Sequence, residues 1–197
     1  MRKLKVTAQK FSLQRENTKG FTLVELLVVI AIIAILAAVV VLVINPVELT
    51  RRGRDATRLS DVATLTNAIT VALQENASVA NFLCDGAAPT GTPPRCGGNS
   101  GADGTEADGS GWVTVDLAGQ QAVKVPALPR DPGTNTGVYV YTYSSDGTDW
   151  EINAVLESTE HYTKMNTDGG NTNDVTGCPS ACSASPKYEV GSKLDLL

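Results

Sequence analysis

The sequence is poor in the side chains on which most enzymes and zinc sites depend. Its 197 residues include one histidine, His161, and four cysteines, none of them in Cys-x-x-Cys spacing. Catalysis needs a nucleophile beside a base, or paired carboxylates in a cleft, and the single imidazole lies in a polar stretch typical of a protein surface. We therefore expect a protein that is not an enzyme and that needs no cofactor.

Basic residues are scarce after the first 20 positions. The chain holds 16 basic and 21 acidic residues, and residues 1–20 contain six of the basic groups but only one acid. A chain without this leader would carry a formal net charge of −10. From Asn81 onward there are 6 basic and 15 acidic residues, which argues against direct nucleic-acid binding. The glycine-rich residues 97–111 also lack the Gly-Lys-Ser/Thr of a phosphate-binding loop.

One long apolar run dominates the chain. The 24 residues from Phe21 to Ile44 include only two polar side chains, Thr22 and Glu25. At about 1.5 Å per residue, a helix of this length reaches roughly 36 Å and can cross a hydrocarbon core of about 30 Å. Residues 21–44 are thus predicted to span a membrane, with the basic leader inside and the rest outside. An unpaired carboxylate costs about 2.5 to 3.5 kcal/mol at the bilayer centre, so Glu25 is expected to have a role.

The leader precedes the apolar run in an unusual order. A secretory signal peptide is cleaved after its apolar segment. Here a cationic segment and a small residue, Gly20, come first. Cleavage of the Gly20–Phe21 bond would remove residues 1–20 and leave the apolar helix as the new N-terminus.

At these residues the chain resembles the type IV pilins and the related pseudopilins of type II secretion. Members of that family have Gly at the end of the leader, Phe and Thr at the first two mature positions and Glu at the fifth, as at Gly20, Phe21, Thr22 and Glu25. The resemblance implies cleavage by a prepilin peptidase, N-methylation of Phe21 and polymerisation with an inner-membrane assembly platform. It also implies that Glu25 pairs with the α-amino group of Phe21, on its own chain or a neighbour, and so sets the register of the filament.

A charged neck and an amphipathic helix follow the apolar run. Asn45-Pro46 is expected to kink or open the helix, because proline removes a backbone hydrogen bond. Residues 45–58 are interpreted as a solvated collar. Since helices of related filaments lose regular structure near such a proline, residues 45–53 are a candidate extensible segment. Apolar residues at helical spacing then predict a helix that packs on a sheet of its own domain, ending near residue 78: Leu59, Val62, Leu65, Ile69 and Leu73.

Residues 81–197 are predicted to form a head domain outside the membrane. A long loop is expected over residues 84–111, strands at 112–117 and 122–125, a hairpin of 137–143 with 149–156, and a short strand at 187–190. The alternating tyrosines of the hairpin favour a sheet face over a ligand platform. Residues 128–133, with the tyrosine hairpin and Glu157 that follow, also resemble the region before and within the sheet of major pseudopilins and of several Gram-positive-like pilins. The predicted class is α+β, a long N-terminal helix packed on a small antiparallel sheet in the pilin fold.

The remaining candidate sites are the four cysteines, for disulfides or zinc, and one acidic loop, for calcium. Cys84 and Cys96 are 12 positions apart and Cys178 and Cys182 are 4 apart, which favours two local disulfides over zinc, although four cysteines allow three pairings. Some major pseudopilins bind calcium in a C-terminal loop, but the oxygen ligands here lack EF-hand spacing and are also ordinary turn residues. The weak calcium candidates are Asp168, Asn171, Asn173 and Asp174.

Two functions fit these features. The first is a structural subunit of a type IV pilus-like filament, held in the cytoplasmic membrane before assembly and exported into an extracellular pilus. The second is a pseudopilin of a type II secretion or DNA-uptake system. A plain membrane-anchored binding domain or anchored enzyme would leave Gly20 and Glu25 unexplained.

Overall fold

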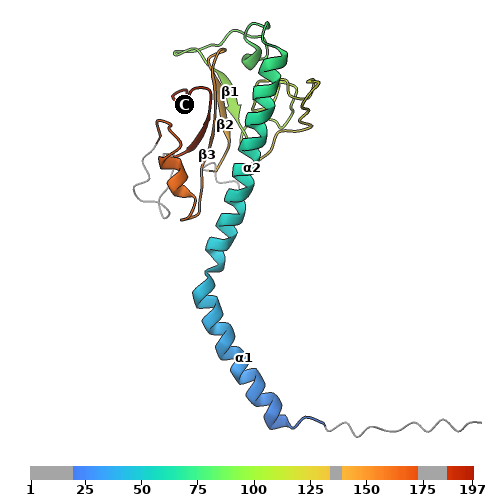
Figure 1. Ribbon diagram of the computed structural model, residues 1–197, viewed down its shortest axis with the longest axis vertical. Coiled ribbons are helices and arrows are strands. Elements are labelled where there is room, and N and C mark those ends of the chain that lie inside the picture. Colours follow the sequence, from blue (N-terminus) through green and yellow to red (C-terminus); the bar gives the residue numbers. More distant parts are fainter. Residues whose placement is uncertain (1–19, 134–138, 173–185) are drawn as a thin grey trace, which may run out of the picture. The chain divides into compact units, whose positions relative to one another are not determined.

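The computed structural model describes residues 20–133, 139–172 and 186–197, and the chain divides into two compact units at the Ile44–Asn45 bond. Two long helices, two short 3-10 helices and four strands give the α+β class that the sequence predicts (Figure 1). In chain order these are α1 (Leu23–Ile44), α2 (Pro46–Glu75), η1 (Phe82–Cys84), β1 (Cys96–Asn99), β2 (Thr142–Ser145), β3 (Trp150–Ala154), η2 (Tyr162–Asn166) and β4 (Tyr188–Gly191).

Helix α1 is apolar on all sides. Apart from Glu25 its sequence is made only of Leu, Val, Ile and Ala, and its window Leu23–Val41 is long and apolar enough to cross a membrane. None of that window is buried within the protein. A helix without a polar face needs an apolar environment around its whole circumference, which lipid or other apolar helices can supply.

The helical run is interrupted at a single residue. Asn45 has a φ of 43° and a ψ of 80°, in or near the left-handed region that asparagine tolerates better than most residues. Its side-chain oxygen accepts the N–H of Glu48 at 3.4 Å, and Pro46 occupies the first turn of α2, where its missing N–H costs no hydrogen bond. The sequence therefore predicted the place of the break to within one residue, and residues 21–78 form two helices where one was expected.

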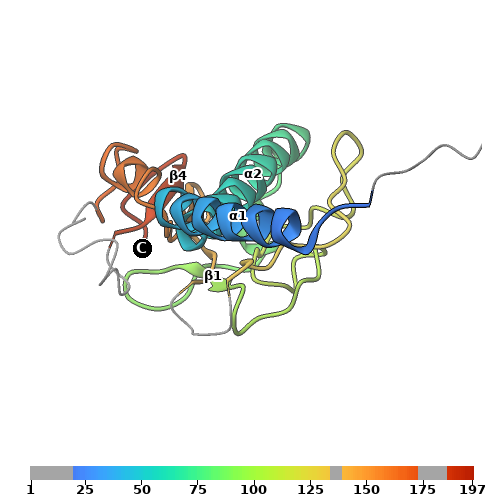
Figure 2. The same ribbon diagram turned by 90° about the horizontal axis from the view of Figure 1, so that it is seen from below.

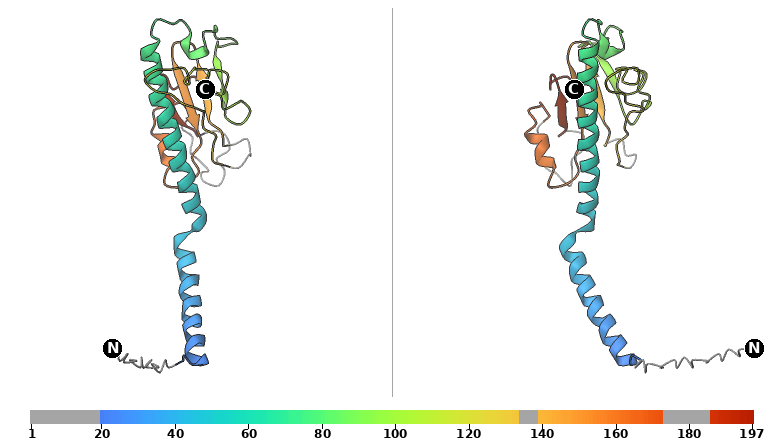
Figure 3. Two further views of the ribbon diagram at one scale, coloured as in Figure 1. Left: turned by 90° about the vertical axis from the view of Figure 1, so that its right-hand side faces the viewer. Right: turned by 45° about the vertical axis from the view of Figure 1, so that its right-hand side comes forward.

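The second helix packs on the head through the predicted apolar stripe. Val62, Leu65 and Ile69 are buried in the core, while Leu59 and Leu73 are half-buried at its margins. The helix lies along the strands of the sheet, as both panels of Figure 3 show. It ends at Glu75, three residues earlier than expected, where the N–H of Asn76 bonds to the carbonyl of Ala72.

The sheet is antiparallel with strand order β1-β2-β3-β4. A hairpin is present as β2 and β3, with Thr142 opposite Asn153 and Ser145 opposite Trp150, but its first strand begins at Thr142, so residues 139–141 of the strand predicted over 137–143 lie outside it. Tyr143 of β2 is buried in the core, as is Tyr141 just before the strand. The C-terminal strand, β4, lies one residue beyond its predicted start and end. Helix η2 lies beside β4, on the side of the sheet away from β1 (Figure 2).

Three predictions about the head were wrong. Residues 112–117 and 122–125 form no strand, although Trp112, Val113, Val115 and Leu117 are fully buried in the core. Their β-branched and aromatic character reflects burial, because such residues fill a core equally well from irregular backbone. Conversely, β1 lies inside the predicted loop, with glycines at positions 97 and 98. A Cβ on Gly97 would lie 2.0 Å from the carbonyl oxygen of Tyr143, so close strand approach explains glycine there.

Candidate assembly site

The first turn of α1 is capped by two polar side chains, Thr22 just before the helix and Glu25 within it. The Glu25 carboxylate accepts the backbone N–H of Thr22 at 2.8 Å and its hydroxyl at 2.7 Å, and the Thr22 hydroxyl oxygen accepts the N–H of Glu25 at 3.2 Å. This reciprocal pattern is a capping box, which satisfies backbone donors that a helix start leaves free. The Thr-x-x-Glu spacing could have predicted it from the sequence.

The residues predicted for cleavage, Gly20 and Phe21, lie beside this cap. Phe21 is 88% exposed, and no atom lies within 4 Å of the position that a Cβ on Gly20 would take. While the leader is attached, Phe21 has a peptide nitrogen and no α-amino charge, so Glu25 bonds to its own helix. The expected pairing of Glu25 with the Phe21 amine therefore stays a prediction.

Comparison with known families bears on this N-terminal segment. A family model described as the prokaryotic N-terminal methylation motif matches residues 15–41, which include Gly20, Phe21 and Glu25. The motif indicates a type IV pilin-like or pseudopilin precursor. A search of curated proteins and a search of solved structures find no significant match to the chain.

The class III signal peptide implies processing by prepilin peptidase and assembly in a pilus or a secretion system. Together with the apolar α1, it implies membrane anchoring before assembly. The family of this signal peptide is a structural one, of pilins and pseudopilins. The methylation motif ends within α1, so it assigns no role to the head.

The charged neck of the precursor differs from its prediction. Asp55 and Arg58 were expected in a solvated collar, but both are fully buried. The Arg58 guanidinium donates two hydrogen bonds of 2.7 Å to Asp131 and one of 2.8 Å to Asp55, and it lies 2.6 Å from Glu157. It also stacks 5.0 Å from the ring centre of Tyr139. A planar guanidinium can serve several carboxylates at once, which explains arginine at this position.

The electrostatics of this cluster favour its charged state. Burial alone would raise the pKa of Glu157, but hydrogen bonds from Arg54 and Arg58 outweigh burial and lower that pKa. Burial alone would lower the pKa of Arg58, yet the hydrogen bonds that Arg58 donates to Asp131 and Glu157, and their negative charges, raise it well above its usual value. Asp55 additionally accepts the backbone N–H groups of Glu157 and Ser158, at 2.9 and 2.7 Å. The collar prediction failed because its carboxylate partners, at positions 131 and 157, are remote in the sequence.

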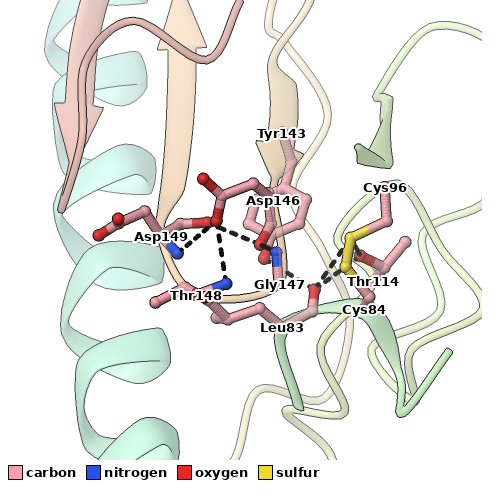
Figure 4. Close-up of a disulfide and its surroundings, with 10 residues drawn as sticks. Leu83, Cys84, Cys96, Thr114, Tyr143, Asp146, Gly147, Thr148 and Asp149 are labelled. Carbon is pink, nitrogen blue, oxygen red and sulfur yellow. Dashed lines mark hydrogen bonds between the residues drawn. A yellow bond between two sulfur atoms is a disulfide. The ribbon is translucent and has the colours of Figure 1, made fainter. Parts of the chain in front are cut away.

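The region around η1 is fixed by the disulfide Cys84–Cys96, one of the two expected local bridges (Figure 4). Beside it the carbonyl oxygen of Leu83 accepts the Thr114 hydroxyl at 2.9 Å and the Tyr143 hydroxyl at 3.0 Å. These bonds join η1, β2 and the irregular segment 105–128. The bridge therefore ties β1 to the end of α2 through η1.

The structure describes none of the second predicted disulfide and only part of the predicted calcium loop. Cys178, Cys182, Asn173 and Asp174 lie outside the described residues. Asp168 accepts the N–H groups of Gly170 and Glu189, at 3.1 and 2.9 Å, so its carboxylate already has a structural role. Within the described ranges no group of three or more His, Cys, Asp or Glu side chains could hold a metal ion. His161 bonds to the Ser158 hydroxyl at 3.2 Å, as expected of a hydrogen-bonded surface histidine.

Proposed function

We propose that this protein is a structural subunit of a type IV pilus-like filament. Prepilin peptidase removes residues 1–20, and the α1 helix anchors the subunit in the cytoplasmic membrane. Subunits then polymerise with their α1 helices in the filament core. The observation that carries the proposal is the combination of the methylation motif with a helix that is apolar around its whole circumference. Such a helix exchanges lipid for protein neighbours without exposing its apolar surface to water.

Glu25 gives the assembly its register in this proposal. Cleavage creates a positive α-amino group at Phe21, four residues before a carboxylate that lies in an apolar helix. In a filament core of low dielectric constant, an isolated carboxylate is costly and a paired one much less so. Subunits that align Glu25 with a Phe21 amine are therefore favoured over other registers.

Two substitutions separate this role from helix capping. Glu25→Gln keeps a hydrogen-bonding side chain that can serve the capping box but removes the charge, whereas Glu25→Ala removes both. We expect both variants to insert into the membrane and both to lose filaments, as scored by electron microscopy and membrane fractionation. Normal filaments from the Gln variant would refute charge pairing and leave only a capping role.

A pseudopilin is the second candidate, favoured by the resemblance of residues 129–143 to major pseudopilins. Immunogold electron microscopy of the cell surface distinguishes the two. Long, abundant labelled filaments are expected for a major pilin. Their absence, with the processed protein present in the membrane, would favour a pseudopilin.

A further inference from the structure

The contacts between the first half of α2 and residues 157–160 form two groups that differ in burial. The outer group consists of Glu48, which accepts the N–H and hydroxyl of Thr159 at 2.8 and 2.6 Å, and of Arg52, which pairs with Glu160 at 2.7 Å. The side chains of Arg52 and Glu160 are 44% and 57% exposed, whereas that of Glu48 is 12% exposed. Exposed pairs contribute little to stability, because water and salt compete for both partners.

The inner group is shielded from water. Asp55 and Arg58 are fully buried, the side chain of Glu157 is 7% exposed, and that of Asp131 is 4% exposed. Removing one partner from such a cluster leaves another charge buried and unpaired, which is strongly unfavourable. The boundary between the groups falls between Arg52 and Arg54 and coincides with Gly53, a poor helix former with nothing within 4 Å of its Cβ position.

We propose that α2 contains a built-in stop to unwinding. Residues 46–53 open and re-form while the head stays folded, and the inner group around Arg58 halts the opening at Arg54. The break at Asn45 supplies a helix end from which opening starts, and it is resisted by the outer contacts and by the pairs of Glu48 with Arg51 and Arg52 within the helix. The break does not specify where opening ends, whereas the buried ion cluster does.

The consequence for a filament rests on the proposed function. Eight residues that pass from helix to extended chain lengthen from about 1.5 to about 3.3 Å each, a gain of roughly 14 Å. A subunit pulled from its N-terminal side would lengthen by this amount before any core contact of the head is broken.

Amide hydrogen exchange of the full processed chain in detergent micelles tests the stop. The N–H groups of residues 50–57 bond to carbonyls of residues 46–53, so they lose protection when that segment opens. We expect them to exchange at least about 100-fold faster than the N–H groups of residues 58–72. Equal protection across residue 58 would overturn the proposal.

Matched variants locate the stop. Glu157→Gln weakens the inner group and should speed exchange of residues 58–61 about tenfold or more, because their acceptors are the carbonyls of residues 54–57. Glu160→Gln makes the same chemical change in the outer group and should leave residues 58–61 unaffected. If the two variants act alike, the inner group is not the stop.

A milder variant keeps the test decisive if Glu157→Gln fails to fold. Thr159→Val removes a hydroxyl bond to Glu48 and should speed exchange only within residues 50–57; faster exchange beyond Arg58 would contradict the stop. Filament formation is scored separately. A chain that shows the exchange boundary at residue 58 but never polymerises counts against the proposed function alone.

Discussion

Arg58 illustrates how a charged side chain can belong to the core of a head domain. In the sequence it is one of several charges after Pro46, and only its position one residue before the apolar stripe sets it apart. In the structure it is fully buried and opposed by carboxylates from three separate segments. The apolar contacts that hold α2 to the sheet are therefore followed, toward the N-terminus of the helix, by the ion pairs of Arg58.

Replacing Arg58 should be among the most damaging single changes in the head. Arg58→Met keeps apolar volume but leaves Asp55, Asp131 and Glu157 buried without their shared cation, so we expect the free energy of unfolding to fall by about 3 to 5 kcal/mol. Urea unfolding of the processed chain in detergent, followed by tryptophan fluorescence, measures this loss. Arg52→Met, at an exposed pair, should cost less than about 1 kcal/mol; a similar cost at both positions would contradict the buried-cluster interpretation.

Glu151 is a buried acid whose pKa is raised, in contrast to Glu157, whose pKa is lowered. One carboxylate oxygen accepts the N–H of Leu196 at 2.6 Å, while the other has no hydrogen-bond partner. Burial raises the pKa of Glu151 despite that bond, so the folded protein holds this proton more tightly than the unfolded chain does. Its contribution to stability is present below the unfolded pKa and is lost as pH rises through the folded pKa.

Glu151→Gln should therefore remove a pH-dependent penalty. The amide stays neutral and can still accept from Leu196, so we expect a higher melting temperature than wild type at pH 7 and little difference at pH 4. Thermal unfolding at several pH values measures the effect, with Glu160→Gln as the exposed control. A variant that loses stability equally at pH 4 and pH 7 would contradict a raised pKa of Glu151 in the folded protein.

Among the elements, β1 is the most dependent on a covalent link. It is short, glycine-containing and at the edge of the sheet, and such strands have little intrinsic stability. The Cys84–Cys96 bridge closes a short loop, and closing a loop of this size stabilises a fold by about 3 kcal/mol in the chain-entropy treatment.

Replacing Cys84 and Cys96 together by Ala should detach β1 before the other strands. We expect amides of residues 96–99 to lose hydrogen-exchange protection while those of β3, which pairs on both sides, keep it. The fall in the free energy of unfolding should be about 3 kcal/mol. Simultaneous loss of protection in β1 and β3 would mean that the bridge supports the whole sheet.

The elements also show what local sequence can predict. Helix α2 and the β2–β3 hairpin were predictable because their periodicity and turn residues are local. The prediction of Gly20 and Phe21 as a processing site came from a short, specific motif, in a stretch that the family model matches. By contrast, the burial of Arg58 and the pairing of Gly97 with Ser144 depend on partners more than 40 residues away, which no local pattern contains.

At the scale of the whole molecule, processing and head folding should be independent. The chain divides at Ile44–Asn45, and the contacts described for the head core lie within residues 45–197. Charge separates along the chain in the same sense, with a basic leader before the apolar helix and an acidic head after it. We therefore expect the leader to direct membrane topology and processing, and the head to fold on its own.

This independence can be tested by blocking cleavage. Gly20→Leu replaces the small residue at the cleavage bond, so we expect the intact mass to retain residues 1–20, whereas the wild-type protein begins at Phe21. The head should still contain the Cys84–Cys96 disulfide and unfold at the wild-type temperature. Gly53→Leu is the matched control, because both positions have open space around a new Cβ, and it should be cleaved normally. An uncleaved head that lacks the disulfide would show that folding waits for processing, and a wild-type chain that keeps its leader would contradict the assigned cleavage site.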